Sequence, residues 1–309
     1  MAKYYNLVAL NIVIIFLLFT LPILSALFIV LLSPLVNTVF LLSITDAITY
    51  TYPTEVSPSF WVFFIWAFIF IWQIIWIFYS MNLSYRVVRG GPPVLLTSVF
   101  LGIFILSLLL HVALNIAAVF LLVLAFVFLM LLSVSLFVCL ALSYKSLYDN
   151  RQILADQRRG LDDSLVRGLV HNGLGLYATW TLIAALINIA VLMTYRSNPP
   201  IDQSTASTVS LAFIAAFLVL YFITDLTVFD KYSRYTFTPY AALLWALVAI
   251  LVNNVDFRKH NTIFTAVLLG LTGLSLIVKI VVVCVKKKTK PLFPDPTVVR
   301  DTVVGHSGL

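Results

Sequence analysis

Long apolar segments recur along almost the whole of this chain. Eight of them can cross a bilayer as helices, because about 20 apolar residues cover about 30 Å of hydrocarbon. They are continuous, whereas strands of a membrane barrel alternate over roughly ten residues. The sequence therefore predicts an all-α polytopic transmembrane bundle of about eight spans. The expected spans are residues 7–32, 59–79, 93–111, 115–142, 172–195, 207–228, 238–253 and 262–285.

The composition excludes a water-soluble protein. The chain is 62% hydrophobic and 10% charged, whereas soluble domains average about 45–50% apolar and about 25% charged residues. A soluble fold of 309 residues could not bury this much apolar surface. We therefore expect an integral multi-pass membrane protein, and the sequence does not indicate which cellular membrane holds it.

Residues 93–142 form one uncharged stretch whose only strongly polar side chains are those of His111 and Asn115. A single helix of 50 residues would be about 75 Å long at 1.5 Å per residue, more than twice the hydrocarbon thickness. Two helices fit better than one. We expect the turn between them near His111 and Asn115, although no glycine or proline marks it.

Lys and Arg residues collect on alternate connections between the predicted spans. Fifteen of the 19 lie at the termini or on connections that an even number of spans places on the same side as the termini. Three lie on the opposite side, and Lys279 lies inside the last predicted span. Cytoplasmic connections of membrane proteins carry such an excess, so both termini are predicted to be cytoplasmic. The net charge of +7 then reflects topology, and we expect no nucleic-acid partner.

The segments outside the membrane are short and form no separate soluble domain. Residues 33–58 are expected to face outward, where they could form a short lid. Residues 143–171 suggest an extension of the fourth span, a break at Gly160 and a short interfacial helix. The predicted organisation is a helical bundle over residues 1–285, followed by a disordered cytoplasmic tail over residues 286–309.

The second predicted span is rich in tryptophan. Trp61 and Trp76 lie near its ends, where aromatic belts occur, whereas Trp66 and Trp72 lie deeper. Gln73 near mid-membrane must find a hydrogen-bond partner, because an unsatisfied polar group there costs several kcal/mol. Two interpretations stay open: Gln73 bonds to another helix, or it contacts a flat ligand that lies on the tryptophans.

Three segments resemble the tryptophan-rich sensory proteins, the wider relatives of the translocator protein. The segment PSFWVFFIWAFIFIWQ looks like the second-helix signature of that family, with matches at Pro58, Trp61, Phe63 and Trp66. GLGLYATWTLIAALINIAVL (173–192) is similar to a later family helix, with matches at Leu176, Tyr177, Trp180, Ala184 and Asn188. YAALLWALVAIL (240–251) is similar to a further segment through Trp245, Ala246 and Leu247. Because it has more spans than the five-helix members, the chain looks closer to longer variants.

The resemblance implies a helical bundle that binds flat hydrophobic molecules such as tetrapyrroles or sterols without catalysing a reaction. The pocket that it implies is formed by Trp61, Trp66, Tyr177, Trp180 and Asn188. The alternative is that the aromatic side chains only pack and that Asn188 joins two helices. Expected partners are membrane lipids and a hydrophobic small molecule, and a homo-oligomer stays open.

No catalytic or metal-binding motif occurs in the sequence, so we expect neither an enzyme nor a metal site, and no cofactor other than a tetrapyrrole bound as ligand. Haem ligation by His111 and His171 is disfavoured, because the predicted spans place them near opposite membrane faces. The second functional hypothesis is a small-solute transporter or channel-like protein, which broken helices and buried ion partners would favour.

Asp225 and Lys279 are charged residues that fall inside predicted spans. Both lie toward the cytoplasmic ends of their helices, at depths that differ by roughly 5 Å at 1.5 Å per residue. Two arrangements are open: an ion pair between the sixth and eighth spans, or two side chains that each extend to the membrane surface.

Overall fold

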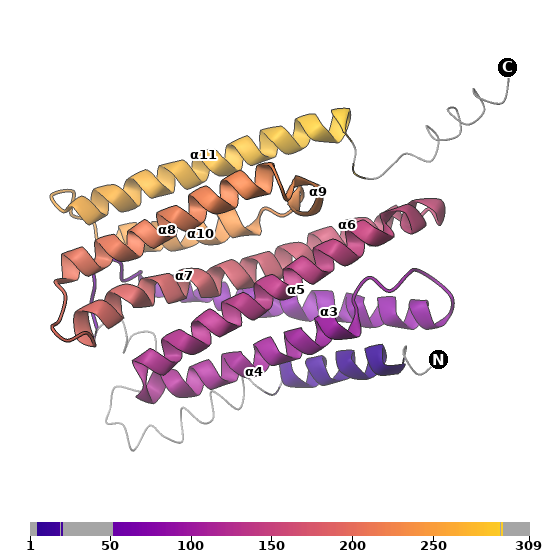
Figure 1. Ribbon diagram of the computed structural model, residues 1–309, viewed down its shortest axis with the longest axis horizontal. Coiled ribbons are helices and arrows are strands. Elements are labelled where there is room, and N and C mark those ends of the chain that lie inside the picture. Colours follow the sequence, from indigo (N-terminus) through magenta and orange to yellow (C-terminus); the bar gives the residue numbers. More distant parts are fainter. Residues whose placement is uncertain (1–4, 19, 21–51, 291, 293–309) are drawn as a thin grey trace.

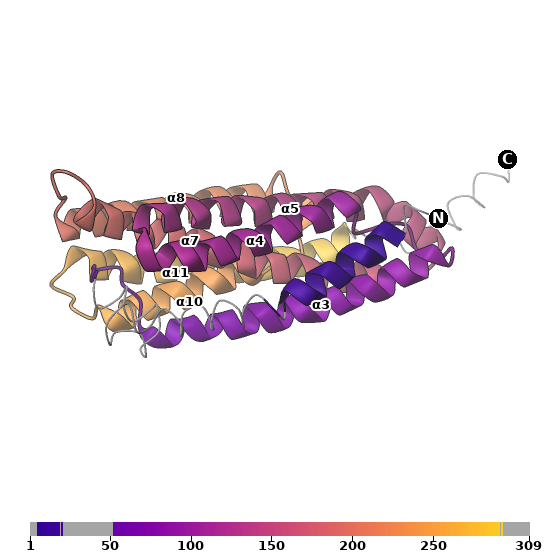
Figure 2. The same cartoon turned by 90° about the horizontal axis from the view of Figure 1, so that it is seen from below.

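The computed structural model describes residues 5–18, 20, 52–290 and 292 (Figure 1). Helices run back and forth along one long axis and form a bundle, and the described residues contain no strand (Figures 1 and 2). The all-α polytopic bundle predicted from the sequence is therefore confirmed. Residues 21–32 of the first predicted span, residues 33–51 and most of the predicted tail lie outside the described residues.

Six helices are long and apolar enough to cross a membrane: Phe60–Val88, Ser98–Ala117, Leu122–Asp156, Gly160–Tyr195, Gln203–Leu226 and His260–Thr289. Two shorter apolar helices, Tyr5–Leu18 and Thr238–Asn253, accompany them. The elements are the 3₁₀-helix η3 (Phe60–Phe64), α3 (Ile65–Val88), α4 (Ser98–Phe120), α5 (Leu122–Asp156), α6 (Gly160–Leu165), the π-helix η4 (Val166–His171), α7 (Asn172–Tyr195), α8 (Gln203–Leu226), α9 (Asp230–Ser233), α10 (Thr238–Asn253) and α11 (His260–Thr289).

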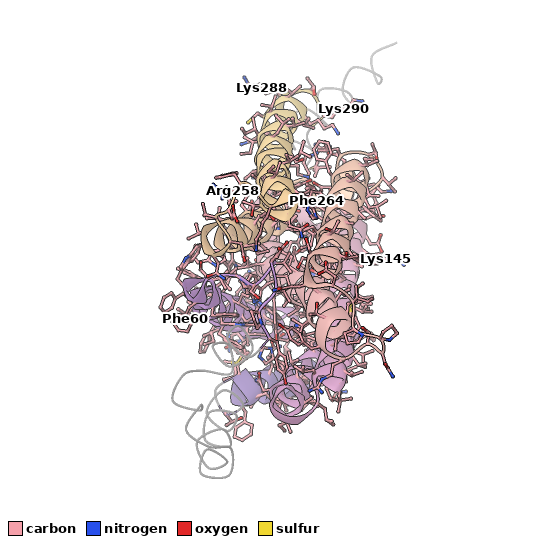
Figure 3. The ribbon with its side chains drawn as sticks, turned by 90° about the vertical axis from the view of Figure 1, so that its left-hand side faces the viewer. Phe60, Lys145, Arg258, Phe264, Lys288 and Lys290 are labelled. Carbon is pink, nitrogen blue, oxygen red and sulfur yellow. The ribbon has the colours of Figure 1, made fainter. Side chains whose placement is uncertain are left out.

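The N-terminal helix begins, and α11 ends, at the same end of the bundle (Figure 1). We call it the termini-proximal end and the opposite one the distal end. The N-terminal helix packs beside α3, where Asn11 Nδ2 donates to Ser84 Oγ at 3.2 Å. Many apolar side chains point away from the bundle, as Phe60 does in Figure 3, where its side chain is exposed. Such a surface suits contact with lipid tails.

The turn between the third and fourth spans lies later in the chain than the sequence pattern predicts. Helix α4 continues through His111 and Asn115 to Phe120, and the chain reverses at Leu121, whose backbone is extended at φ −141° and ψ 89°. The prediction near His111 was wrong because a polar side chain need not end a helix if it finds a partner inside the bundle. His111 has such a partner in Tyr177.

The segment after α5 also differs from the expectation. Helix α5 extends to Asp156, and Gly160 begins α6 as predicted, but α6 continues through η4 into α7 instead of forming a separate interfacial helix. At the other end of the chain, residues 286–289 form the last turn of α11. They therefore do not belong to a disordered tail.

Helix α7 lies at the centre of the bundle and contacts α3, α5, α8 and α10. Small residues on α7 permit this close packing, since Ala178, Ala185 and Ala190 are fully buried. Of the two glycines of α7, Gly173 is packed more tightly, because a Cβ atom there would lie 2.8 Å from Cδ1 of Trp72 on α3. A larger residue at Gly173 would therefore require the Trp72 side chain to move.

Residues 52–59 bind the distal ends of the helices together. Tyr195 at the end of α7 donates to the Pro53 carbonyl at 2.7 Å. The Glu55 carboxylate accepts from Asn261 at 2.7 Å and pairs with Lys259 at 3.2 Å. Burial opposes ionisation of Glu55, but the Asn261 hydrogen bond and the Lys259 charge outweigh it and lower the pKa of the carboxyl. This part of the predicted outward loop is thus fixed to the bundle.

We expect the termini-proximal end to face the cytoplasm, because the basic connections gather there. The Asn82-Leu83-Ser84 acceptor pattern should then stay unglycosylated. In sealed vesicles that keep the cytoplasmic face inside, a C-terminal tag should be protected from added protease, whereas a tag inserted after Asp256, at the distal end, should be digested. A glycan on Asn82 of the unaltered chain would contradict this orientation.

Candidate ligand site

Aromatic side chains from α3, α4 and α7 meet inside the bundle. The Trp66 ring centre lies 4.9 Å from that of His111, 6.1 Å from that of Tyr177 and 6.2 Å from that of Trp180. All three contacts are edge-to-face, and Phe70 stacks on Trp66 at 5.9 Å. We call Trp66, Phe70, His111, Tyr177 and Trp180 the aromatic cluster. Edge-to-face pairs at these distances are favourable beyond the area that they bury.

The polar groups of the aromatic cluster are unequally satisfied. His111 Nδ1 and the Tyr177 hydroxyl share a hydrogen bond of 2.7 Å. The Trp180 side chain is buried, yet its Nε1–H has no acceptor among the described residues. Buried polar groups are normally hydrogen-bonded, and an unpaired one costs about 1–3 kcal/mol. The cluster therefore combines apolar ring surfaces with one buried indole donor that lacks an acceptor among the described residues.

Gln73 and Trp72 lie one to two turns further along α3 and join it to α7. Gln73 Nε2 donates to the Gly173 carbonyl at 3.1 Å, and Gln73 Oε1 accepts from Trp76 Nε1 at 2.6 Å. Trp72 Nε1 donates to the Leu169 carbonyl of η4 at 3.0 Å. Of the two interpretations of Gln73, these contacts favour a hydrogen bond between helices.

The other two residues of the pocket implied by the resemblance lie elsewhere. Trp61 contacts Trp245 edge-to-face at 5.1 Å, and Trp245 Nε1 donates to the Val62 carbonyl at 2.8 Å. Asn188 Nδ2 donates to the Ala184 carbonyl of its own helix at 3.0 Å. The structure thus brings together Trp66, Tyr177 and Trp180 from the expected set. It adds His111 to them, a residue that the sequence suggested only as a turn residue or a disfavoured haem ligand.

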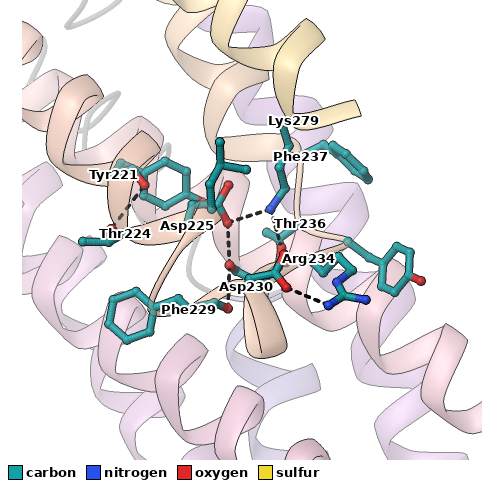
Figure 4. Close-up of polar contacts among 12 residues, drawn as sticks. Tyr221, Thr224, Asp225, Phe229, Asp230, Arg234, Thr236, Phe237 and Lys279 are labelled. Carbon is teal, nitrogen blue, oxygen red and sulfur yellow. Dashed lines mark hydrogen bonds and ion pairs between the residues drawn. The ribbon is translucent and has the colours of Figure 1, made fainter. Parts of the chain in front are cut away.

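Asp225 and Lys279 meet between α8 and α11 (Figure 4). Lys279 Nζ lies 2.8 Å from Asp225 Oδ1, and the side chains are 0% and 1% exposed. The Tyr240 hydroxyl donates to Asp225 Oδ2 at 2.9 Å, and the Ser233 hydroxyl donates to Oδ1. Of the two arrangements left open by the sequence, this geometry is that of the ion pair, since neither side chain extends to the surface.

The three histidines within the described residues, His111, His171 and His260, lie apart from one another. His171 Nε2 lies 3.1 Å from Ser143 Oγ, and the His171 ring packs against Tyr144 at 4.5 Å. His260 Nε2 shares a hydrogen bond of 2.9 Å with Thr208 at the distal end. Within the described part of the chain, no group of three or more His, Cys, Asp and Glu side chains is placed to hold a metal ion.

A family model described as TSPO-like protein matches residues 7–282 of the chain. No curated protein and no solved structure matches it significantly. The matched residues include every helix that contributes to the aromatic cluster and both members of the buried ion pair. Because the match extends over most of the sequence, this multi-pass membrane protein belongs to the TSPO-like protein family.

Proposed function

We propose that this protein binds a flat hydrophobic molecule at the aromatic cluster, as a binding or sensing protein and not as an enzyme. The observation that carries the proposal is the buried Trp180 Nε1–H, which has no acceptor among the described residues and belongs to a ring that contacts Trp66. A ligand with a carbonyl, carboxylate or hydroxyl oxygen would satisfy this donor while its apolar body contacts the aromatic rings.

The position of Trp66 is compatible with entry of a ligand from the bilayer. Trp66 is only partly buried, whereas Tyr177 and Trp180 on α7 lie in the interior. Its neighbours Phe64, the last residue of η3, and Phe68, on α3, are exposed on the outside of the bundle. A lipophilic molecule dissolved in the membrane would therefore meet Trp66 first and the Trp180 N–H deeper inside.

The ligand class rests on chemistry and on the family resemblance together. Tetrapyrroles and sterols are both largely apolar and carry oxygen acceptors at their periphery. Mostly apolar pockets with a few placed polar groups are typical of small-molecule sites. The Tyr177–His111 hydrogen bond provides a second polar point, but it is already formed within the protein, which makes Trp180 the preferred anchor for an acceptor.

Replacing Trp66 and Trp180 together by alanine should weaken ligand binding at least tenfold, which corresponds to about 1.4 kcal/mol. The single change Trp180→Phe should also weaken binding, because it removes the N–H donor and keeps an aromatic ring. Quenching of tryptophan fluorescence by a panel of porphyrins, sterols and small ions would measure both effects.

The matched control is Trp61→Phe, because Trp61 contacts Trp245 and lies outside the aromatic cluster. It should leave the affinity unchanged within about twofold. An unchanged affinity in the folded Trp66 and Trp180 double variant would show that these side chains serve only in packing. Binding of small ions without any binding of porphyrins or sterols would favour the transporter hypothesis.

A further inference from the structure

We propose that a cluster of two basic and two tyrosine side chains at the termini-proximal end binds the phosphate group of an anionic phospholipid. Tyr148 and Arg151 come from α5, and Lys231 and Tyr232 come from α9. We call these four residues the basic tyrosine cluster. Its position is separate from the aromatic cluster, so this proposal does not depend on the proposed function.

The geometry holds both positive charges against aromatic rings. The Arg151 guanidinium carbon lies 4.1 Å from the Tyr148 ring centre. Lys231 Nζ lies 4.9 Å from the ring centres of both Tyr148 and Tyr232, which are 5.0 Å apart. Cation–π contacts at exposed sites contribute only about 0.5–1 kcal/mol each. They fix the side chains in place but do not neutralise their charges.

Acidic side chains do not provide that neutralisation. In the described residues, neither Arg151 nor Lys231 forms an ion pair, although basic residues around them do. Asp230, next to Lys231 in sequence, is already bound by Arg234 at 2.6 Å and by Lys286 at 3.0 Å. These two cations keep the pKa of Asp230 below its usual value despite its partial burial, which acts in the opposite direction. The basic tyrosine cluster therefore carries two positive charges that lack a protein anion.

The position of the basic tyrosine cluster along the bundle axis indicates that the bound anion is the phosphate of a lipid. Helix α5 has 35 residues, which corresponds to about 52 Å and exceeds the roughly 30 Å of hydrocarbon. Its apolar part ends before Lys145, so Tyr148 and Arg151 lie one to two turns beyond the hydrocarbon. Helix α9 directly follows the membrane helix α8 and contacts this part of α5. Lipid phosphates lie at this level, and tyrosine is favoured there.

The charge and the position together distinguish this site from general attraction to the membrane surface. Lys145, Lys287 and Lys288 are also exposed at the termini-proximal end, and Lys145 and Lys288 are labelled in Figure 3. Such single lysines attract anionic lipid weakly and without a fixed geometry. In the basic tyrosine cluster, the rings hold Arg151 and Lys231 in defined positions. Phosphate binding there therefore costs less side-chain entropy than binding to a lysine that is not held by a ring.

The test compares two double variants that remove the same amount of charge from the same end. Arg151→Gln with Lys231→Gln alters the basic tyrosine cluster, and Lys145→Gln with Lys288→Gln is the control. Native mass spectrometry of the purified protein would measure the apparent affinity for phosphatidylglycerol, with phosphatidylcholine as the zwitterionic comparison and glycerol phosphate as the soluble one. The thermal unfolding transition of each variant, measured in phosphatidylcholine, would verify that the variant is folded.

The expected result is an affinity for phosphatidylglycerol about tenfold lower in the cluster variant and within twofold of the unaltered protein in the control. Affinity for phosphatidylcholine should not change in either. Equal losses of affinity in both double variants would show that the effect depends only on net charge, and would overturn the proposal. Binding of glycerol phosphate as tight as that of the lipid would also overturn it. If the cluster variant does not fold, the single change at exposed Lys231 should still lower the affinity about threefold, and no loss there would overturn the proposal.

Discussion

Asp225→Asn and Lys279→Met should each destabilise the protein by about 3–5 kcal/mol, the range for breaking a buried ion pair by removing one partner. The large effect follows from the burial of both side chains, which are 1% and 0% exposed. After Asp225→Asn, the Lys279 ammonium would stay buried without a counter-charge. After Lys279→Met, the Asp225 carboxylate would keep only the Tyr240 and Ser233 hydroxyls.

The double variant should recover much of this loss, because two neutral side chains leave no uncompensated charge in the membrane. A thermodynamic cycle of the four proteins, from melting in detergent, measures the coupling between the two sites. Strictly additive losses would show that the two charges do not interact. Lys259→Met provides a surface comparison, because Lys259 is 51% exposed in its pair with Glu55 and such pairs contribute about 0–1 kcal/mol.

The depth of these two charges could be predicted from the sequence, whereas their pairing could not. Span boundaries and the rise per residue placed Asp225 and Lys279 at similar levels, but sequence spacing does not indicate which helices touch. The structure shows that α8 contacts α11 directly. It also adds Ser233 from α9 and Tyr240 from α10 to the pair, and no periodicity in the sequence connects those short elements with Asp225.

The candidate ligand site was predictable to a similar extent. Trp66, Tyr177 and Trp180 were implied by the resemblance of two segments to helices of the family. His111 was missed because its polar character suggested a turn. A histidine in an otherwise uncharged stretch of 50 residues was nevertheless a signal, since a helix that spans a membrane must pair such a side chain inside the bundle. Trp61 and Asn188 share the motifs but contact other partners.

Asn172→Leu should destabilise the protein by at least about 3 kcal/mol, because the Asn172 side chain joins the junction of η4 and α7 to the start of α10, whose N-cap residue makes no side-chain cap. Its Nδ2 donates to the Arg167 carbonyl of η4 at 2.9 Å and to the Tyr235 carbonyl at 2.8 Å. Its Oδ1 accepts from the backbone amides of Phe237 and Thr238, at 2.9 and 3.3 Å. Leucine has a similar volume but would leave the Tyr235 carbonyl and the Phe237 and Thr238 amides without this partner, and each buried unsatisfied group costs about 1–3 kcal/mol.

The matched control is Asn188→Leu on the same helix. Asn188 Nδ2 donates only to the Ala184 carbonyl, which already accepts a hydrogen bond within the helix, so this change should cost less than about 1 kcal/mol. Unfolding both variants in detergent by increasing concentrations of sodium dodecyl sulfate would compare their free energies of unfolding. A large loss only at Asn172 would show that this amide, at the point where η4 meets α7, fixes the start of α10 against the central helix. Equal losses at the two positions would instead indicate that any asparagine in α7 contributes through its own helix, and the contact with α10 would then carry little of the stability.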